Sequence, residues 1–458
     1  MQTAFSSLRS RHSPSTRIFI LALLTAAIIF NILGLVFALQ WIKAPFPGTL
    51  LYANLVVADT YNPDWSARQQ GIRSGDALLA VDDVPVTSGR DLYLLLQEQA
   101  VGETAALSIE PYLAQAAPPE TQLSVTLTDF SLQDMLIFFW LPYIIGLIYL
   151  SLGLVIFRLR QIGRASNIFI TFCAFVSIVA GGIFDHYTLH FLTPIWLFVL
   201  PLSGAALIHL GLEFPITSRL MRHQLWLRFV PYVVALALGM ANLYSLYFAA
   251  NSRLYLTIRL WDFGFIGLAY LLFLGLQLHT RLFTLSSMVR QQTSIIFWSS
   301  IIAFGPAGLW LITNAVGWRT PFVWPIFAGV FIPVTVFPLA ITYAMLRYRI
   351  LDIDTVFNRG MVYTLLTLLV TVVYFIIVSF LGALFQGSLF QDPIVLAIFV
   401  VVLVIALDPL KQRIQTAVNR LFLRETFDYR QILQSYGRSL ISAPLSSHHI
   451  LELLVQQA

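Results

Sequence analysis

The chain has few charged residues. Only 11% of its 458 residues are Asp, Glu, Lys or Arg, whereas 58% are hydrophobic. A soluble domain carries about 25% charged residues, so the composition excludes an ordinary soluble protein and indicates one that crosses a membrane many times. The net charge of +5 does not indicate binding to nucleic acid, because the basic residues lie in short segments between long apolar runs.

Cysteine and catalytic motifs are also scarce. The single cysteine, Cys173, lies inside an apolar run, which excludes a disulfide framework and a cysteine metal site. The sequence contains neither the His-Glu-x-x-His helix of zinc proteases nor the Gly-x-Ser-x-Gly turn of hydrolases. Phosphate-binding glycine loops are absent too. We therefore predict no catalytic residue, no metal ligand and no cofactor in this chain, which leaves open whether the whole protein is an enzyme.

Long apolar runs predict about ten transmembrane helices, each near the roughly 20 residues that a crossing needs. The first run, 18–42, follows the segment 1–17 and is longer than the core of about 7–15 residues of a cleaved signal peptide. It is expected to stay as a span. The region 135–409 contains the others, at 135–157, 166–184, 191–212, 229–248, 258–278, 293–316, 323–345, 361–385 and 393–409.

Basic residues alternate between the loops. They follow the second, fourth, sixth and eighth predicted spans, and the opposite loops carry almost none. By the positive-inside rule, both termini then lie in the cytoplasm and the segment 44–130 lies outside. The expected location is the plasma membrane of a bacterial cell.

The segment 44–130 is polar and of domain size. Its pattern predicts a strand-like stretch at 54–59, a short helix at 63–70 ended by Gly71, and a strand at 77–81 with a hairpin tip at Asp82-Asp83. Ser88 is expected to cap a helix that runs to about residue 100, and a further strand is predicted at 104–110.

This segment resembles a bacterial PDZ domain, with the motif residues Gly71, Gly75 and Asp76 in the run Gly-Ile-x-x-Gly-Asp, followed by Val-Asp-Asp-Val-Pro-Val. PDZ domains bind an extended peptide as an added strand. The resemblance implies a peptide groove between the segment 48–54 and the helix 88–100, lined by Gly48, Thr49, Leu50, Leu51, Leu92 and Leu95. A PDZ-like module with a closed groove, used only for interaction or as a spacer, remains a second interpretation.

Ionisable residues inside predicted spans are costly to bury, by about 2.5 kcal/mol or more. His209 and Glu213 are four residues apart and could pair along one helix face, and Asp262 lies near the outer end of its span. These residues are few and scattered, so we expect a role in packing or signalling rather than in transport.

The last predicted span leads into a basic amphipathic helix. Pro409 suits its first turn, and Leu410, Ile414, Val418 and Leu421 form one apolar stripe. We expect this helix to transmit a signal out of the membrane, within a cytoplasmic segment 410–458.

The segment Leu346 to Asp354 resembles the joint before the penultimate span of bacterial sensor histidine kinases, and Asp408 to Arg430 resembles the exit segment of the same proteins. The outer PDZ-like domain is similar to the arrangement in Gram-positive quorum-sensing competence kinases. The resemblance implies a sensor for an extracytoplasmic peptide or protein ligand. It also implies a homodimer, and a kinase core in cis after a GAF domain that begins near residue 436. The alternatives are a stand-alone PDZ-bearing membrane scaffold or a transporter-like protein.

Overall fold

The computed structural model describes residues 14–347 except 43, 61, 113–120, 160–162, 218–223 and 316–328. The predicted spans 361–385 and 393–409 lie outside the described residues. So do the predicted exit residues Pro409, Leu410, Ile414, Val418 and Leu421.

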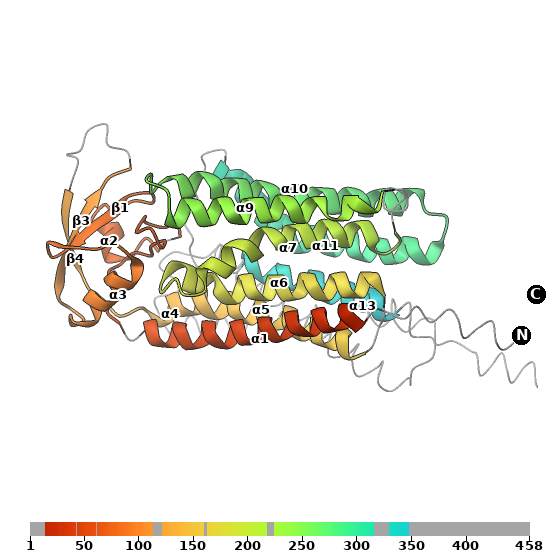
Figure 1. Ribbon diagram of the computed structural model, residues 1–458, viewed down its shortest axis with the longest axis horizontal. Coiled ribbons are helices and arrows are strands. Elements are labelled where there is room, and N and C mark those ends of the chain that lie inside the picture. Colours follow the sequence, from red (N-terminus) through yellow and green to blue (C-terminus); the bar gives the residue numbers. More distant parts are fainter. Residues whose placement is uncertain are drawn as a thin grey trace, which may run out of the picture. The chain divides into compact units, whose positions relative to one another are not determined.

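The described chain consists mainly of long helices that run side by side (Figure 1). They are α1 (Pro14–Trp41), α5 (Leu141–Arg158), α6 (Arg164–Tyr187), α7 (Thr193–Glu213), α9 (Val230–Tyr247), α10 (Leu254–Phe283), α11 (Ser287–Ala315) and α13 (Val336–Arg347). A short helix α4 (Leu132–Met135) and a π-helical turn (Leu136–Trp140) lead into α5 without a break.

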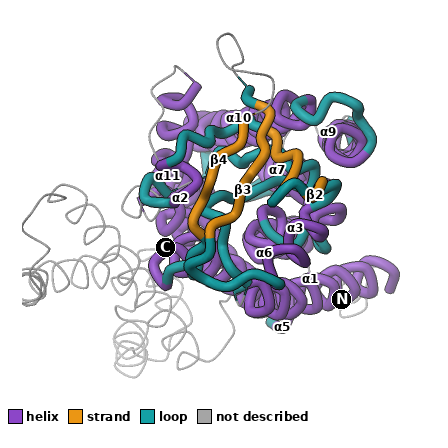
Figure 2. The backbone as a smooth tube through the Cα atoms, turned by 90° about the vertical axis from the view of Figure 1, so that its left-hand side faces the viewer, coloured by secondary structure: helices purple, strands orange, loops and turns teal. Residues whose placement is uncertain are grey.

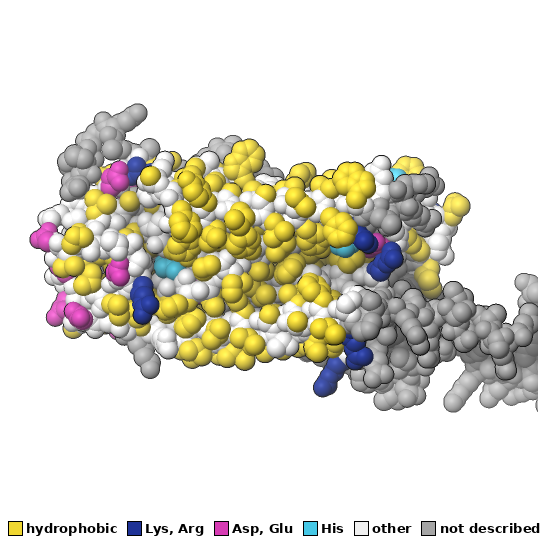
Figure 3. All heavy atoms as spheres, in the orientation of Figure 1, with side chains coloured by type: hydrophobic (Ala, Val, Ile, Leu, Met, Phe, Trp, Pro, Cys, Tyr) yellow, Lys and Arg dark blue, Asp and Glu magenta, His cyan; other side chains and the backbone are white. Residues whose placement is uncertain are grey.

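Seven helical stretches among the described residues are long and apolar enough to cross a membrane. They are Ser15–Trp41, Leu132–Arg158, Arg164–Tyr187, Thr193–Glu213, Trp226–Tyr247, Leu254–Phe283 and Gly329–Leu346. The protein is therefore a multi-pass helical membrane protein. Seven of the predicted spans correspond to these stretches, and the predicted span 293–316 corresponds to α11. Hydrophobic side chains cover the visible face of the helices, whereas acidic side chains gather at the end formed by the small domain (Figure 3).

Helix α6 lies at the centre of one half of the bundle, where it packs against α1, α5 and α7. Small residues allow the close approach: a Cβ on Gly34 of α1 would lie only 2.7 Å from the backbone oxygen of Gly181 of α6. Beside this crossing, Asn31 donates a hydrogen bond to the Ser177 hydroxyl at 3.0 Å. Small residues and an interhelical hydrogen bond are what hold helices together in lipid.

Between α1 and α4 the chain forms a small α/β domain. It contains α2 (Ser66–Gln69), β1 (Ala77–Val81), β2 (Val84–Pro85), α3 (Gly89–Gln97), β3 (Thr104–Glu110) and β4 (Thr121–Thr126). All pairings in its four-stranded sheet are antiparallel, in the order β2-β1-β3-β4. Figure 2 shows this sheet in front of the ends of the helices.

Local chemistry explains most of these elements. Asp82 and Asp83 adopt φ values of 49° and 62°, as a tight hairpin turn between β1 and β2 requires. Gly71 has φ +98° and ends α2, with its N–H bonded to the Arg68 carbonyl. The Ser88 hydroxyl accepts the backbone N–H of Asp91 and so caps α3.

Two details of the domain differ from the sequence predictions. The stretch 54–59 is not a continuous strand, because Leu55 has φ +63° and closes a turn onto the Tyr52 carbonyl. Only isolated bridges flank this turn, Leu51 with Val57 and Val56 with Ala77. Strand β4, which was not predicted, completes the sheet beside β3.

Asp76 fixes the turn that precedes β1. Its buried carboxylate accepts the backbone N–H groups of Arg73 at 2.7 Å and Tyr112 at 2.8 Å. Gly75, directly before it, has φ +93°. The motif residues therefore stabilise the domain, and they line no ligand site among the described residues.

Candidate functional site

The small domain shares a hydrophobic core with the ends of the helices. The segments that enter and leave the domain pair with each other through two backbone hydrogen bonds between Phe46 and Thr128, of 2.7 and 3.0 Å. Trp41 at the end of α1 contacts Phe46, Phe130 and Phe184 with ring centroids 5.1–5.7 Å apart. Because these aromatic rings are buried, the domain sits on the helices as part of one packed structure.

An ion pair between a buried arginine and a half-exposed aspartate joins the domain to α10. The guanidinium of Arg259 lies 2.9 Å from Asp59 of the domain, and the exposed fractions of the two side chains are 9% and 53%. Arg259 also lies over the rings of Tyr52 and Phe263, at 5.1 and 5.0 Å from their centroids. The Tyr52 hydroxyl donates to Asp59 at 2.8 Å. The arginine therefore fills a site made partly by the domain.

More polar groups are buried in α6, α9 and α10 near this ion pair. Tyr255 and His186 share a hydrogen bond of 3.0 Å, and Asn242 donates to Asp262 at 2.6 Å. All four side chains are buried. We call this cluster, together with Arg259 and Asp59, the polar junction.

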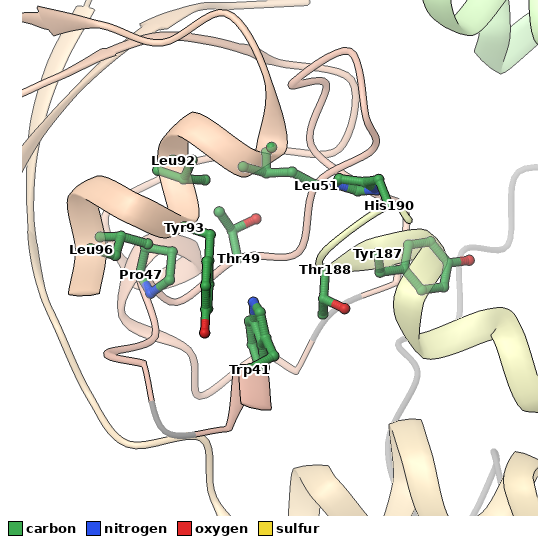
Figure 4. Close-up of a pocket in the computed structure, with 11 residues that line it drawn as sticks. Trp41, Pro47, Thr49, Leu51, Leu92, Tyr93, Leu96, Tyr187, Thr188 and His190 are labelled. Carbon is green, nitrogen blue, oxygen red and sulfur yellow. The ribbon is translucent and has the colours of Figure 1, made fainter. Parts of the chain in front are cut away.

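A second contact between domain and bundle is a narrow groove between the segment 47–51 and α3 (Figure 4). The domain side consists of Pro47, Thr49, Leu51, Gly89, Leu92, Tyr93 and Leu96, and the bundle side of Trp41, Tyr187, Thr188 and His190. The cavity left between the two sides has a volume of about 20 Å³, which is room for about one water molecule.

This groove lies where the sequence predicted a peptide site. Thr49, Leu51 and Leu92 line it, whereas Gly48, Leu50 and Leu95 do not. Leu50 points the other way because neighbouring residues of an extended segment face opposite sides, and it is buried in the core shared with the bundle. Leu95 packs against the core of the domain, and the backbone of Gly48 lies against α2.

His190 lies in the connection between α6 and α7, Thr188 to Leu192, which we call the α6–α7 loop. Its ring contacts the first turn of α3 so closely that a Cβ on Gly89 would overlap it. The Nδ1 atom of His190 lies 3.1 Å from the His186 carbonyl. Burial lowers the pKa of His190 to about 4, so the ring is neutral at pH 7.

Asp185 holds this loop in place. Its backbone oxygen accepts the N–H of His190 at 2.9 Å, and its carboxylate accepts the N–H groups of Leu192 at 2.7 Å and Phe191 at 3.3 Å. His190 has φ +64°, a conformation that residues other than glycine rarely adopt. The loop therefore has a defined conformation, set by the end of α6.

The structure does not bring together the three ionisable residues that the sequence singled out. His209 and Glu213 do not pair: Nδ1 of His209 bonds the Tyr232 hydroxyl at 3.1 Å, and Glu213 accepts from Thr217 at 2.9 Å. Each of them instead bonds a partner outside its own helix. Asp262 belongs to the polar junction, at the opposite end of the helices.

Sequence reasoning missed the bundle side of the site. Arg259, His186, Tyr187 and His190 come from segments far from the domain in sequence, and no local pattern relates them to it. One signal was available: Arg259 is a charged residue in an apolar run, three positions before Asp262, and such a residue needs a partner.

No family model, curated protein or solved structure matches this chain. The geometry of the groove and of the helix ends beside it is therefore what bears on function.

Proposed function

We propose that this chain is the sensory region of a bacterial membrane receptor of the histidine-kinase type. In this proposal the small domain is a PDZ-like module outside the cell that binds a peptide or protein ligand. When the ligand binds, the helices pass the resulting conformational change to a cytoplasmic kinase core in cis, within a homodimer.

The observation that carries the proposal is the composition of the groove wall. Trp41 ends α1, Tyr187 ends α6, and both line the groove together with Thr49 and Leu92 of the domain. Anything that enters or leaves this groove must move against the ends of two membrane-spanning helices. A ligand that has different affinities for two arrangements shifts their populations, so the groove is well placed to transmit a signal.

The local structure of the domain supports a PDZ-like interpretation. The hairpin, the capped helix α3 and the extended segment beside it occur in the order that the motif implies, and the groove lies between α3 and that segment. The isolated bridge between Leu51 and Val57 leaves one edge of the segment unpaired, and an added strand needs such an edge.

The distribution of charge argues against a transporter. In the seven candidate spans, every charged or histidine side chain lies in the first or last third of its helix, for example Asp134, His209, Asp262 and His279. A relay for protons or ions needs such groups along one path through the membrane. The described spans offer no such path.

The coding sequence beyond codon 458 tests the kinase assignment. We expect an in-frame GAF domain, then a helix with the phosphoacceptor histidine and an ATP-binding domain. A stop codon, or an unrelated domain, would overturn the assignment.

A further inference from the structure

The segment that forms one side of the groove has a free backbone edge. Ala58 donates to the Leu50 carbonyl and Tyr52 to the Val56 carbonyl, both at 2.9 Å, on either side of the bridge between Leu51 and Val57. In an antiparallel pair, backbone groups alternate between the two edges. The N–H groups of Thr49 and Leu51 therefore point away from this pairing, and neither has an acceptor among the described residues.

The opposite wall of the groove is apolar. Leu92 and Leu96 are one helical turn apart on α3 and are both buried, and Tyr93 lies beside them. The free edge and this wall together fit an extended chain with apolar side chains at alternate positions, because such a chain would satisfy the N–H groups and bury its side chains against α3.

The groove has no room for such a chain. The α6–α7 loop and Trp41 close it and leave a cavity of about 20 Å³. The loop cannot simply swing aside, because Asp185 accepts four of its backbone N–H groups, those of Thr188, His190, Phe191 and Leu192, and its Leu189 is buried. Opening must therefore separate the domain from the helix ends, which also breaks the ion pair between Asp59 and Arg259.

We propose that the helix bundle gates this groove: the α6–α7 loop and Trp41 occupy its mouth, and an extended apolar peptide adds to the edge at Thr49 and Leu51 only when the domain lifts off the bundle. The inference rests on the proposed function, since it describes how the same ligand site is regulated. Docking of the domain and binding of the peptide exclude each other. The free energy of peptide binding then drives the change at the ends of α1 and α6, because bound peptide stabilises the undocked arrangement.

A cysteine at position 49 reports on the gate. We would replace Thr49 by Cys in a Cys173→Ala background, reconstitute the chain in lipid nanodiscs and measure its rate of reaction with a maleimide. His190→Gly removes the ring from the groove and tolerates the positive φ, and Arg259→Gln removes the ion pair without touching the groove. Arg290→Gln, at an exposed position away from the domain, is the matched control.

The expected result is a rate that rises about fivefold or more with His190→Gly and with Arg259→Gln, a change equivalent to a modest shift in the docking equilibrium. The rate should not change with Arg290→Gln. The same variants with Thr49 and Cys173 intact must keep the buried Cys173 unreactive, which shows that the bundle is folded. Equal rates in all four chains would overturn the gate.

A second measurement separates the gate from the ligand. Short fluorescent peptides with Leu, Val or Phe at alternate positions are compared with a pool that has Ser and Asn at those positions. In a chain with Gly89→Cys and His190→Cys, a disulfide should hold the groove shut. We expect the apolar pool to bind only after reduction. Equal binding before and after reduction would overturn the gate but leave the peptide receptor standing. An open gate with no binding of either pool would overturn the peptide ligand of the proposed function, and the gate itself would stand.

Discussion

Replacement of Asp59 by Asn should loosen the domain more than replacement of its partner, Arg259, by Met. The two side chains differ in burial: that of Arg259 is 9% exposed and that of Asp59 is 53% exposed. Removal of one member of a fully buried pair costs about 3–5 kcal/mol, whereas an exposed pair contributes about 0.2–1 kcal/mol. Because Asp59 is half exposed, we expect Asp59→Asn to weaken docking of the domain by a free energy between these values, about 2 kcal/mol.

Arg259→Met should cost less, about 1 kcal/mol, because methionine fills the space beside Tyr52 and water can solvate the carboxylate that remains. These costs correspond to increases in the undocked fraction of about thirtyfold for Asp59→Asn and about fivefold for Arg259→Met. Thr60 is buried at the interface, where its hydroxyl lies 3.4 Å from the Tyr187 hydroxyl. A Thr60→Cys reporter in a Cys173→Ala background would measure this fraction through its maleimide reactivity.

The double variant Asp59→Asn, Arg259→Met should label at the rate of Arg259→Met alone, since no buried charge is left without a partner. The explanation would be refuted if Arg259→Met labelled as fast as Asp59→Asn, or if the two effects simply added. Either result would mean that aromatic packing, and not the charge, holds Arg259 in place.

Three other predictions concern separate parts of the structure. Between pH 7.5 and 5 the undocked fraction should rise up to about 30-fold more in the natural chain than in His190→Asn, because the docked pKa of His190, about 4, lies below its free value of 6.5. The contribution of neutral His190 to docking is complete above pH 6.5 and is lost as the pH falls to 4. Gly34→Ala should lower the stability of the bundle by about 1–3 kcal/mol, because the added Cβ overlaps α6. In the control Gly264→Ala the Cβ would meet nothing within 4 Å, and stability should change by less than about 0.5 kcal/mol. The reaction of the buried Cys173 with a thiol dye on heating measures both effects. Asp76→Ala leaves two backbone N–H groups without their acceptor and should destabilise the small domain by about 1–3 kcal/mol, which hydrogen exchange in β1 and β3 would detect.

Much of the secondary structure could be predicted because its causes are local. Apolar runs of about 20 residues indicate spans whatever surrounds them, and the structure has helices at every predicted span within the described residues. In the domain, the strand at 104–110, the hairpin at Asp82-Asp83 and the cap at Ser88 show short-range sequence patterns, and all three are confirmed.

The errors occur where a distant partner decides. The stretch 54–59 has the composition of a strand, but a turn at Leu55 folds it back on the segment 50–52. His209 and Glu213 have the spacing of a helix pair, yet Tyr232 and Thr217 satisfy them instead. Spacing shows which groups can meet within a helix, but it carries no information about competing partners on other segments.

The sequence by itself determined that this is a multi-pass helical membrane protein with a small α/β domain after its first span, because hydrophobicity and turn chemistry act over a few residues. Only the tertiary structure decided what the domain rests on. The ends of α1, α6 and α10 bring Trp41, His190 and Arg259 against the domain from three separate regions of the chain. That meeting depends on how the helices pack, which is a property of the whole bundle and of no single segment.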